Sequence, residues 1–218
     1  FENVRGLLTH DKGRTYATIT NIFEQAGYTI QKDVLNAWDF GVPQKRERLI
    51  TIGIRNDLLD KISFSFPKKH DYKPVLRDIL LDCPEGPGVP YGENKRKIFE
   101  LVPPGGYWRD IDPVIAKAYM KSCWDMEGGR TGILRRMSLD EPSLTVLTSP
   151  SQKQTERCHP LEARPFTVRE NARCQTFPDD WQFCGSVQSQ YKQVGNAVPV
   201  NLAYDIAKEI HRALEGEK

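Results

Sequence analysis

The residues best suited to chemistry lie in three short clusters. A carboxyl group at Glu2 is followed by the arginine-rich run 44–48 (Gln-Lys-Arg-Glu-Arg) and, late in the chain, by a Gly195-Asn196 turn expected to open a helix. A carboxyl group with several arginines could cradle a flipped pyrimidine, and such a turn suits a small-molecule cofactor. Taken alone, each cluster also has an ordinary explanation: a surface glutamate, solvated arginines and a structural turn.

Sequence periodicity predicts the elements that must position these clusters. Apolar residues recur at helical spacing over 15–26 and 199–214, which predicts two amphipathic helices. The β-branched run 48–55 predicts a strand buried on both faces, after a β-rich segment over 28–38. An S/T-x-x-E capping box predicts a helix over 167–176. This order of elements is typical of the end of an α/β domain.

The middle of the chain is irregular and rich in proline, glycine and basic residues, which indicates a second, smaller domain whose loops carry recognition. Only short elements are expected there and just after it: helices over 75–81, 95–101 and 112–122, a strand over 143–148, and a turn over 189–193.

Composition excludes several classes of protein. The 218 residues are 39% hydrophobic and 28% charged, as in a soluble globular protein. The net charge of +2 is too small to identify a polyanion binder, so nucleic-acid binding would depend on local basic clusters. Five widely spaced cysteines indicate neither a disulfide framework nor a zinc site. Reduced thiols and the lack of a membrane-length apolar run predict a cytoplasmic protein.

Four motifs, in this order, resemble those of the DNA (cytosine-5)-methyltransferases. Glu2-Asn3-Val4 is similar to the family's E-N-V, and residues 44–48 to its Q-x-R-x-R. Residues 164–178 are similar to R-x-[FL]-T-x-R-E…FP, and 193–198 to Q-x-G-N-[AS]-V. Each motif alone is weak, but four in the family's order, with a variable segment between the second and third, are very specific.

The resemblance implies a fold and a domain organisation. We expect an α/β fold: the C-terminal part of a Rossmann-like, S-adenosylmethionine-dependent methyltransferase domain plus a smaller irregular target-recognition domain. Residues 1–66 would belong to the catalytic domain and 67–163 to target recognition. Residues 164–218 would supply a bracing helix, a cofactor-pocket turn and a terminal helix that returns to the catalytic domain.

The resemblance also implies a reaction, in which a methyl group passes from S-adenosylmethionine to C5 of a cytosine flipped out of double-stranded DNA. In the family a cysteine thiolate adds to C6, and a protonated carboxyl group at N3 stabilises the resulting charge. Glu2 matches this acid, whose pKa would have to be raised by burial. Arg48 matches the arginine at O2, and Arg46 the arginine that supports the nucleophile loop.

Binding residues follow from the same motifs. Asn196, Ala197 and Val198 are expected to line the S-adenosylmethionine pocket. Thr145 and Val146 match a DNA-facing Thr-Leu pair, with valine in place of leucine. Nearby polar residues are candidates for contacting base edges: Ser149, Ser151, Gln152, Lys153, Gln154 and Arg157.

The family's nucleophile lies in a Pro-Cys dipeptide upstream of E-N-V, and no Pro-Cys occurs in this sequence. We therefore expect the C-terminal portion of a methyltransferase from a bacterial restriction-modification or orphan system. It would be inactive alone and completed by an N-terminal part or subunit that carries Pro-Cys and covers its open apolar surfaces. The alternatives are a non-catalytic DNA-binding or regulatory subunit and an RNA-modifying enzyme of the same fold.

Overall fold

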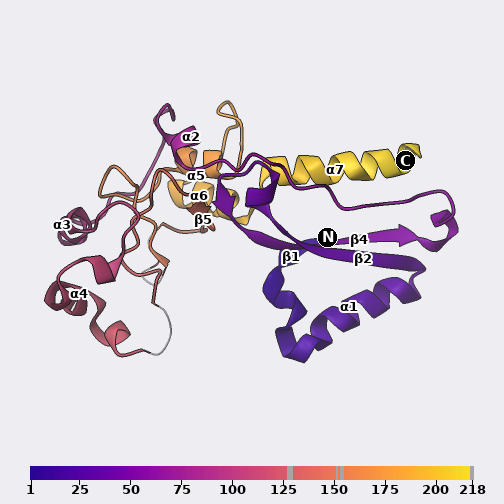
Figure 1. Cartoon of the computed structure of the whole chain (residues 1–218), viewed down its shortest axis with the longest axis horizontal. Helices are drawn as coiled ribbons and strands as arrows, with labels where there is room; N and C mark the ends of the chain where they lie inside the picture. The colour runs from indigo at the N-terminus through magenta and orange to yellow at the C-terminus, as the bar shows by residue number, and fades with distance from the viewer. Residues whose placement is uncertain (127–129, 151, 153–154, 217–218) are drawn as a thin grey trace. The chain divides into compact units, whose positions relative to one another are not determined.

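The computed structural model describes residues 1–126, 130–150, 152 and 155–216 (Figure 1). The chain forms two compact units, one from Phe1–Lys73 with Val200–Lys218 and the other from Pro74–Pro199. No helix within the described ranges is long and apolar enough to cross a membrane. The predicted functional domains, 1–66, 67–163 and 164–218, have different boundaries from these two units. The functional domains remain a prediction.

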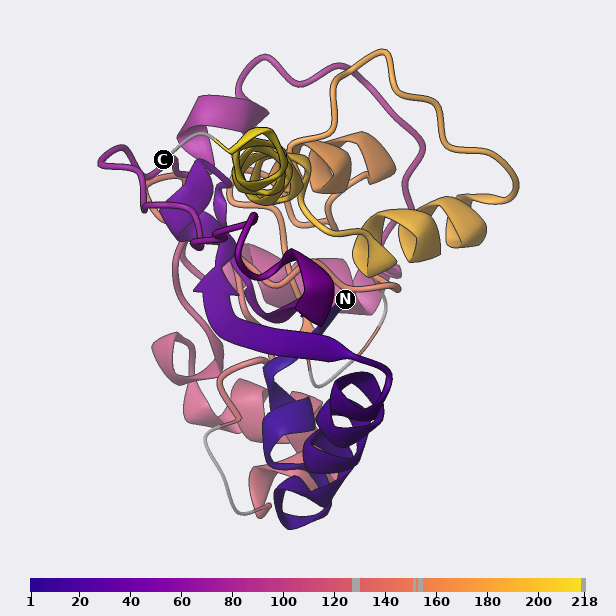
Figure 2. The ribbon, with the colours of Figure 1, turned by 90° about the vertical axis from the view of Figure 1, so that its right-hand side faces the viewer.

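A three-stranded antiparallel sheet forms the centre of the first unit. Its strands are β1 (Glu2–Val4), β2 (Tyr28–Asn36) and β4 (Glu47–Arg55), in the order β1-β4-β2. Helices α1 (Arg14–Gln25) and α7 (Val200–Glu215) lie on opposite sides of this sheet (Figures 1 and 2). The predicted helices over 15–26 and 199–214 and the strand over 48–55 are therefore confirmed, within one or two residues at their ends.

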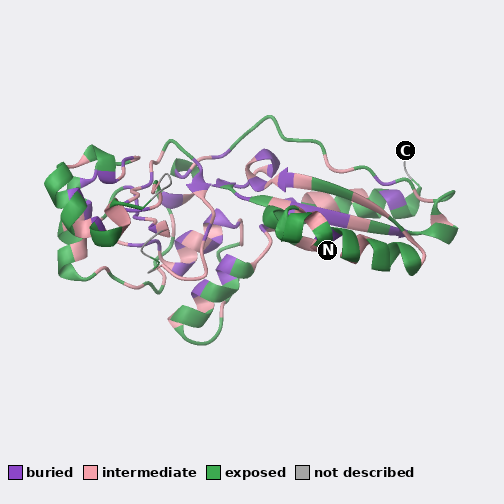
Figure 3. Cartoon of the chain, turned by 90° about the horizontal axis from the view of Figure 1, so that it is seen from below, coloured by how far each residue is buried: buried purple, intermediate pink, exposed green. Residues whose placement is uncertain are grey.

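The centre of β4 is buried on both faces, as its apolar run predicts. Leu49, Ile50 and Thr51 are at most 4% exposed, and successive side chains of a strand point to opposite faces. Glu47 at the start of the strand and Gly53 and Arg55 near its end are exposed, so the prediction of burial on both faces holds only for residues 49–51. Figure 3 shows that buried and exposed stretches alternate along the strands of this unit.

The second unit is built from short helices joined by long loops around two apolar clusters. One cluster includes Leu76, Phe166 and Tyr191, and the other includes Phe99 and Trp108. The helices and the strand of this unit are α2 (Arg77–Leu80), α3 (Glu93–Leu101), α4 (Pro113–Met120), α5 (Val168–Cys174), α6 (Val187–Asn196) and β5 (Ser143–Leu144). Both units also contain short elements: η1 (Arg5–Leu8), η2 (His10–Gly13), η3 (Ala37–Phe40), β3 (Gln44–Lys45), η4 (Asn56–Leu58), η5 (Trp108–Asp110) and η6 (Lys121–Trp124).

Two local predictions were wrong in extent. The turn expected over 189–193 is the ten-residue helix α6, which the Ser186 side chain caps by accepting a hydrogen bond from the Ser189 N–H at 3.2 Å. The strand expected over 143–148 is only two residues long, and the buried side chains of this segment, Ser143 and Val146, are three residues apart rather than alternating as in a strand.

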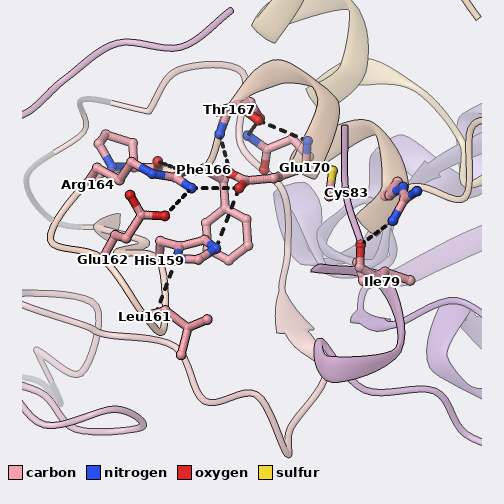
Figure 4. Close-up of polar contacts among 12 residues, drawn as sticks. Ile79, Cys83, His159, Leu161, Glu162, Arg164, Phe166, Thr167 and Glu170 are labelled. Carbon is pink, nitrogen blue, oxygen red and sulfur yellow. Dashed lines mark hydrogen bonds and ion pairs between the residues drawn. The ribbon is translucent and has the colours of Figure 1, made fainter. Parts of the chain in front are cut away.

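Helix α5 begins at the predicted capping box (Figure 4). The Glu170 N–H donates to Thr167 Oγ1 at 3.1 Å, and Glu170 Oε2 accepts from the Thr167 N–H at 2.7 Å. Arg164 donates to both carboxylate oxygens of Glu170, each at 2.8 Å. His159 lies beside this carboxylate, and burial lowers the pKa of its imidazole. One glutamate thus caps the helix and binds the preceding loop.

We predict that Thr167→Ala lowers the free energy of unfolding by about 1 kcal/mol, because it removes one of the two capping bonds. Urea unfolding followed by circular dichroism measures the change. Thr18→Ala, at an exposed position inside α1, is the control and should leave the protein as stable as wild type or slightly more so. Equal losses in the two variants would contradict the capping account.

Candidate active site

The pairing of β1 with β4 brings the proposed acid next to a guanidinium. Glu2 lies opposite Ile50, and Arg48 is two residues from Ile50 along β4, so all three side chains share one face of the sheet. Arg48 Nε and Glu2 Oε1 form an ion pair at 2.7 Å, with side chains 12% and 29% exposed respectively. The two residues matched to N3 and O2 of cytosine are therefore direct neighbours.

Arg46 lies between β3 and β4, two residues before Arg48, and is only 2% exposed. Its N–H donates to Asn36 Oδ1 at 3.2 Å, and its carbonyl oxygen accepts from the Ala37 N–H at 2.9 Å. Burial and the charge of Arg48 lower the pKa of Arg46 to about 10, and the charge of Glu2 acts in the opposite direction. Glu2, Arg46 and Arg48 are thus one electrostatic group in which a single carboxylate faces two guanidiniums.

The predicted cofactor residues lie at the end of α6. Gly195 and Asn196 are the last residues of this helix rather than a turn that opens the next one, which corrects the sequence-based expectation. Asn196 is exposed, and Ala197 and Val198 are half-buried. The fully buried Gln175 side chain donates to the Val194 and Ala197 carbonyl oxygens at 2.9 and 3.2 Å. It thereby satisfies carbonyl groups that a helix C-terminus leaves without an intrahelical partner.

Gly195 has a steric role that sequence reasoning missed. A Cβ atom at this position would lie 2.6 Å from the carbonyl carbon and oxygen of Leu147 and from the nitrogen of Thr148. These are backbone atoms, which cannot swing away as the end of a flexible side chain can. The end of α6 therefore packs directly on the segment that follows Thr145 and Val146, and only glycine permits this approach.

The residues proposed to contact DNA have different environments. Thr145 is half-buried, whereas Val146 is 4% exposed and packs in the apolar cluster with Phe166. Gln152 is exposed and accepts a hydrogen bond from the Thr155 hydroxyl at 3.0 Å. Arg157 is half-buried. Ser151, Lys153 and Gln154 lie outside the described residues. The DNA contacts of this group stay predictions.

Comparison with known families decides the class of protein. The family model for the C-5 cytosine-specific DNA methylases matches residues 1–212. The chain belongs to this family. It is 53% identical, over 96% of its length, to the type II methyltransferase M.Sau96I of Staphylococcus aureus and covers 49% of that protein. It is 51% identical, over 98% of its length, to M.Eco47II of Escherichia coli and covers 53% of it. The chain thus spans about half the length of these curated relatives.

Solved structures show that this methylase chain has the expected fold. A DNA modification methyltransferase encoded within an Escherichia coli prophage matches with a TM-score of 0.66 at 22% identity, over 98% of this chain and 68% of that one. The Dnmt2 methyltransferase of Schizosaccharomyces pombe matches with a TM-score of 0.57 at 14% identity, over 97% and 64% of the two chains. The predicted α/β, Rossmann-like methyltransferase fold is confirmed.

We predict that Gly195→Ala destabilises the methylase chain by about 1–3 kcal/mol, because the added methyl group meets fixed backbone atoms. Urea unfolding measures the loss. Gly6→Ala is the control, since a Cβ atom there would have no other atom within 4 Å. If the two alanine variants were equally stable, the close approach of α6 to Leu147 and Thr148 would be wrong.

Proposed function

We propose that the protein containing this chain is a cytoplasmic type II DNA methyltransferase that methylates C5 of a cytosine in double-stranded DNA. The observation that carries the proposal is the Glu2–Arg48 pair on adjacent strands of a chain that belongs to the C-5 cytosine-specific methylase family. Its similarity to type II methyltransferases supports a role in a restriction-modification system.

The Glu2–Arg48 pair has the geometry that one edge of cytosine requires. N3 and O2 are adjacent acceptors on the ring, and a protonated carboxyl group and a guanidinium are adjacent donors. When a flipped base binds, the 2.7 Å contact between Arg48 and Glu2 would be exchanged for contacts to O2 and N3. Both donors would then lie where negative charge develops as a thiolate adds to C6, and they would stabilise that charge.

Arg46 would act beside this pair rather than on the base. Its side chain is buried, and its backbone is held by Asn36 and Ala37, so its guanidinium has a fixed position near Arg48. We assign it to supporting the loop that carries the nucleophile and the adjacent phosphate. A rigid cation can do this without reorganising during the reaction.

The end of α6 would contribute to the pocket for S-adenosylmethionine, the methyl donor of the reaction. Asn196 offers an exposed amide, and Ala197 and Val198 offer partly accessible apolar side chains. This combination suits a ligand with polar and apolar parts. The Gln175 side chain would hold the pocket wall in place through its bonds to the two carbonyl oxygens.

The catalytic thiolate would come from an N-terminal part or subunit that carries Pro-Cys. Two features of the first unit support such a partner. Among the described strands, β1 pairs with β4 alone, and the neighbouring apolar side chains of Phe1, Val4 and Ile22 are 44%, 54% and 58% exposed. An open strand edge beside apolar surface is a surface that another segment can cover.

We predict that Glu2→Gln lowers kcat for methyl transfer by about 100-fold or more, because an amide group cannot act as an acid that transfers a proton to N3 of the base. The assay uses the full-length protein, duplex DNA and tritiated S-adenosylmethionine. Glu24→Gln, an exposed carboxylate on α1, should retain wild-type activity.

The same assay separates the proposed function from its alternatives. Wild-type protein that binds DNA but transfers no methyl group would indicate a non-catalytic DNA-binding or regulatory protein. Transfer to RNA and not to DNA would indicate an RNA-modifying enzyme. Full activity of Glu2→Gln would support the proposed reaction but show that Glu2 does not take part in it.

A further inference from the structure

Two hydrogen-bonded segments of the unit Pro74–Pro199 present a pair of arginines. The Glu156 N–H donates to the Gly132 carbonyl oxygen at 2.8 Å, and the Cys158 N–H donates to the Arg135 carbonyl oxygen at 3.0 Å. Arg157 lies between these two bonds in its own segment. The backbone pairing therefore holds Arg135 and Arg157 close together, although they are far apart in the sequence.

Glu156, the residue before Arg157, has a buried carboxylate that binds the backbone of Leu134, the residue before Arg135. Glu156 is fully buried, and its oxygens contact Lys95 Nζ at 2.6 Å, the Tyr119 hydroxyl at 2.5 Å and the Leu134 N–H at 2.7 Å. Leu134 has a φ of +50°, a left-handed conformation that is unusual for a bulky side chain. The bond from Glu156 stabilises this turn. The carboxylate is thus committed to other partners and does not neutralise the arginines.

The two guanidiniums carry positive charge that no described acid balances. Burial, followed by the charge of Arg135, lowers the pKa of Arg157 to about 10. Among the described residues, no carboxylate forms an ion pair with Arg135 or Arg157. Like charges held together in a half-buried site repel each other, and an anion bound between or beside them would relieve this cost.

Two further arginines and two aromatic rings lie beside Arg135 in the same unit. The Arg135 guanidinium lies 5.7 Å from the Tyr107 ring centre, and those of Arg109 and Arg130 lie 4.9 and 5.3 Å from the Trp108 ring centre. Stacking on an aromatic ring restrains a guanidinium and leaves its charge in place. The chain has thus placed four arginines around Tyr107, Trp108 and the paired segments.

We propose that Arg135 and Arg157 bind phosphate groups of the DNA backbone, a role that rests on the proposed function as a DNA methyltransferase. Duplex DNA carries one negative charge per about 1.7 Å of its axis, and arginines that contact phosphates displace condensed counterions. The site supplies positive charge that lacks a counter-charge among the described residues, and DNA phosphates supply the negative charge.

The contacts of Arg157 favour a phosphate over a base edge. Its Nε atom is buried without a hydrogen-bond partner among the described residues, and one Nη donates to the Glu156 carbonyl oxygen at 2.9 Å. Only the second Nη is left for a ligand, which suits a single contact to a phosphate oxygen better than a bidentate contact to guanine. We therefore assign Arg157 a phosphate contact in place of the base-edge contact expected from the sequence.

The test measures how DNA affinity depends on salt, using the full-length protein and a labelled duplex of mixed sequence. Affinity is measured by fluorescence anisotropy between about 50 and 200 mM KCl, and log K is plotted against log salt. Arg135→Gln and Arg157→Gln should each make the slope shallower by about 1, and the double variant by about 2. Arg96→Gln is the matched control, since Arg96 is already paired with Glu100, and it should keep the wild-type slope.

Lysine variants separate a loss of charge from a loss of structure. Arg135→Lys and Arg157→Lys retain a point charge, so both should keep the wild-type slope even if a glutamine variant proves unstable in thermal unfolding. Wild-type slopes in the glutamine variants, or reduced slopes in the lysine variants, would overturn the proposal. Variants that keep the slope but methylate a wider range of sequences would show that these arginines contact bases instead.

The wild-type protein distinguishes failure of this proposal from failure of the proposed function. If it neither binds nor methylates duplex DNA, both the proposed function and the proposed phosphate site are wrong. If it methylates duplex DNA and the arginine variants keep its salt dependence, only the phosphate site is wrong.

Discussion

The antiparallel register of β1 with β4 is the constraint on which the proposed chemistry depends. Glu2 opposes Ile50, which places Glu2 and Arg48 on one face within 2.7 Å of each other. A shift of one residue would turn Glu2 to the other face and separate the pair. The Thr51 N–H donates to the Phe1 carbonyl oxygen at 2.9 Å, which ties the start of β1 to the buried centre of β4 in this register. Backbone pairing to a buried central strand therefore positions the polar site of the first unit.

The second unit depends on close backbone approach and on buried polar groups rather than on a sheet. Gly195 allows the end of α6 to pack on the Leu147–Thr148 backbone, and Gln175 satisfies the carbonyl groups at that helix end. Glu170 and Glu156 each hold several donors from different loops. A segment with few regular elements can hold binding residues in fixed positions when each buried carboxylate ties together separate parts of the chain.

The sequence predicted those features that have local signals. The capping box at Thr167, the amphipathic face of α7 and the apolar run of β4 each lie within one short stretch, and the structure contains all three. The roles of Glu2 and Arg48 came from family resemblance, because no local pattern shows which strand residues oppose each other. The sequence shows Arg135 as part of a local basic cluster, but its proximity to Arg157 was missed for the same reason, because it results from pairing between distant segments. The extent of α6 was missed because its apolar face is short.

A double-mutant cycle on Glu2 and Arg48 tests the central claim most directly, with kcat for methylation of duplex DNA by the full-length protein as the readout. If both residues contact one edge of the same cytosine, their effects are coupled. The fold-loss of kcat in the double variant, Glu2→Gln with Arg48→Gln, should then be at least about tenfold smaller than the product of the two single fold-losses. That difference corresponds to a coupling free energy of about 1.4 kcal/mol or more. Single losses that simply multiply would show that the two residues act independently and would contradict the account.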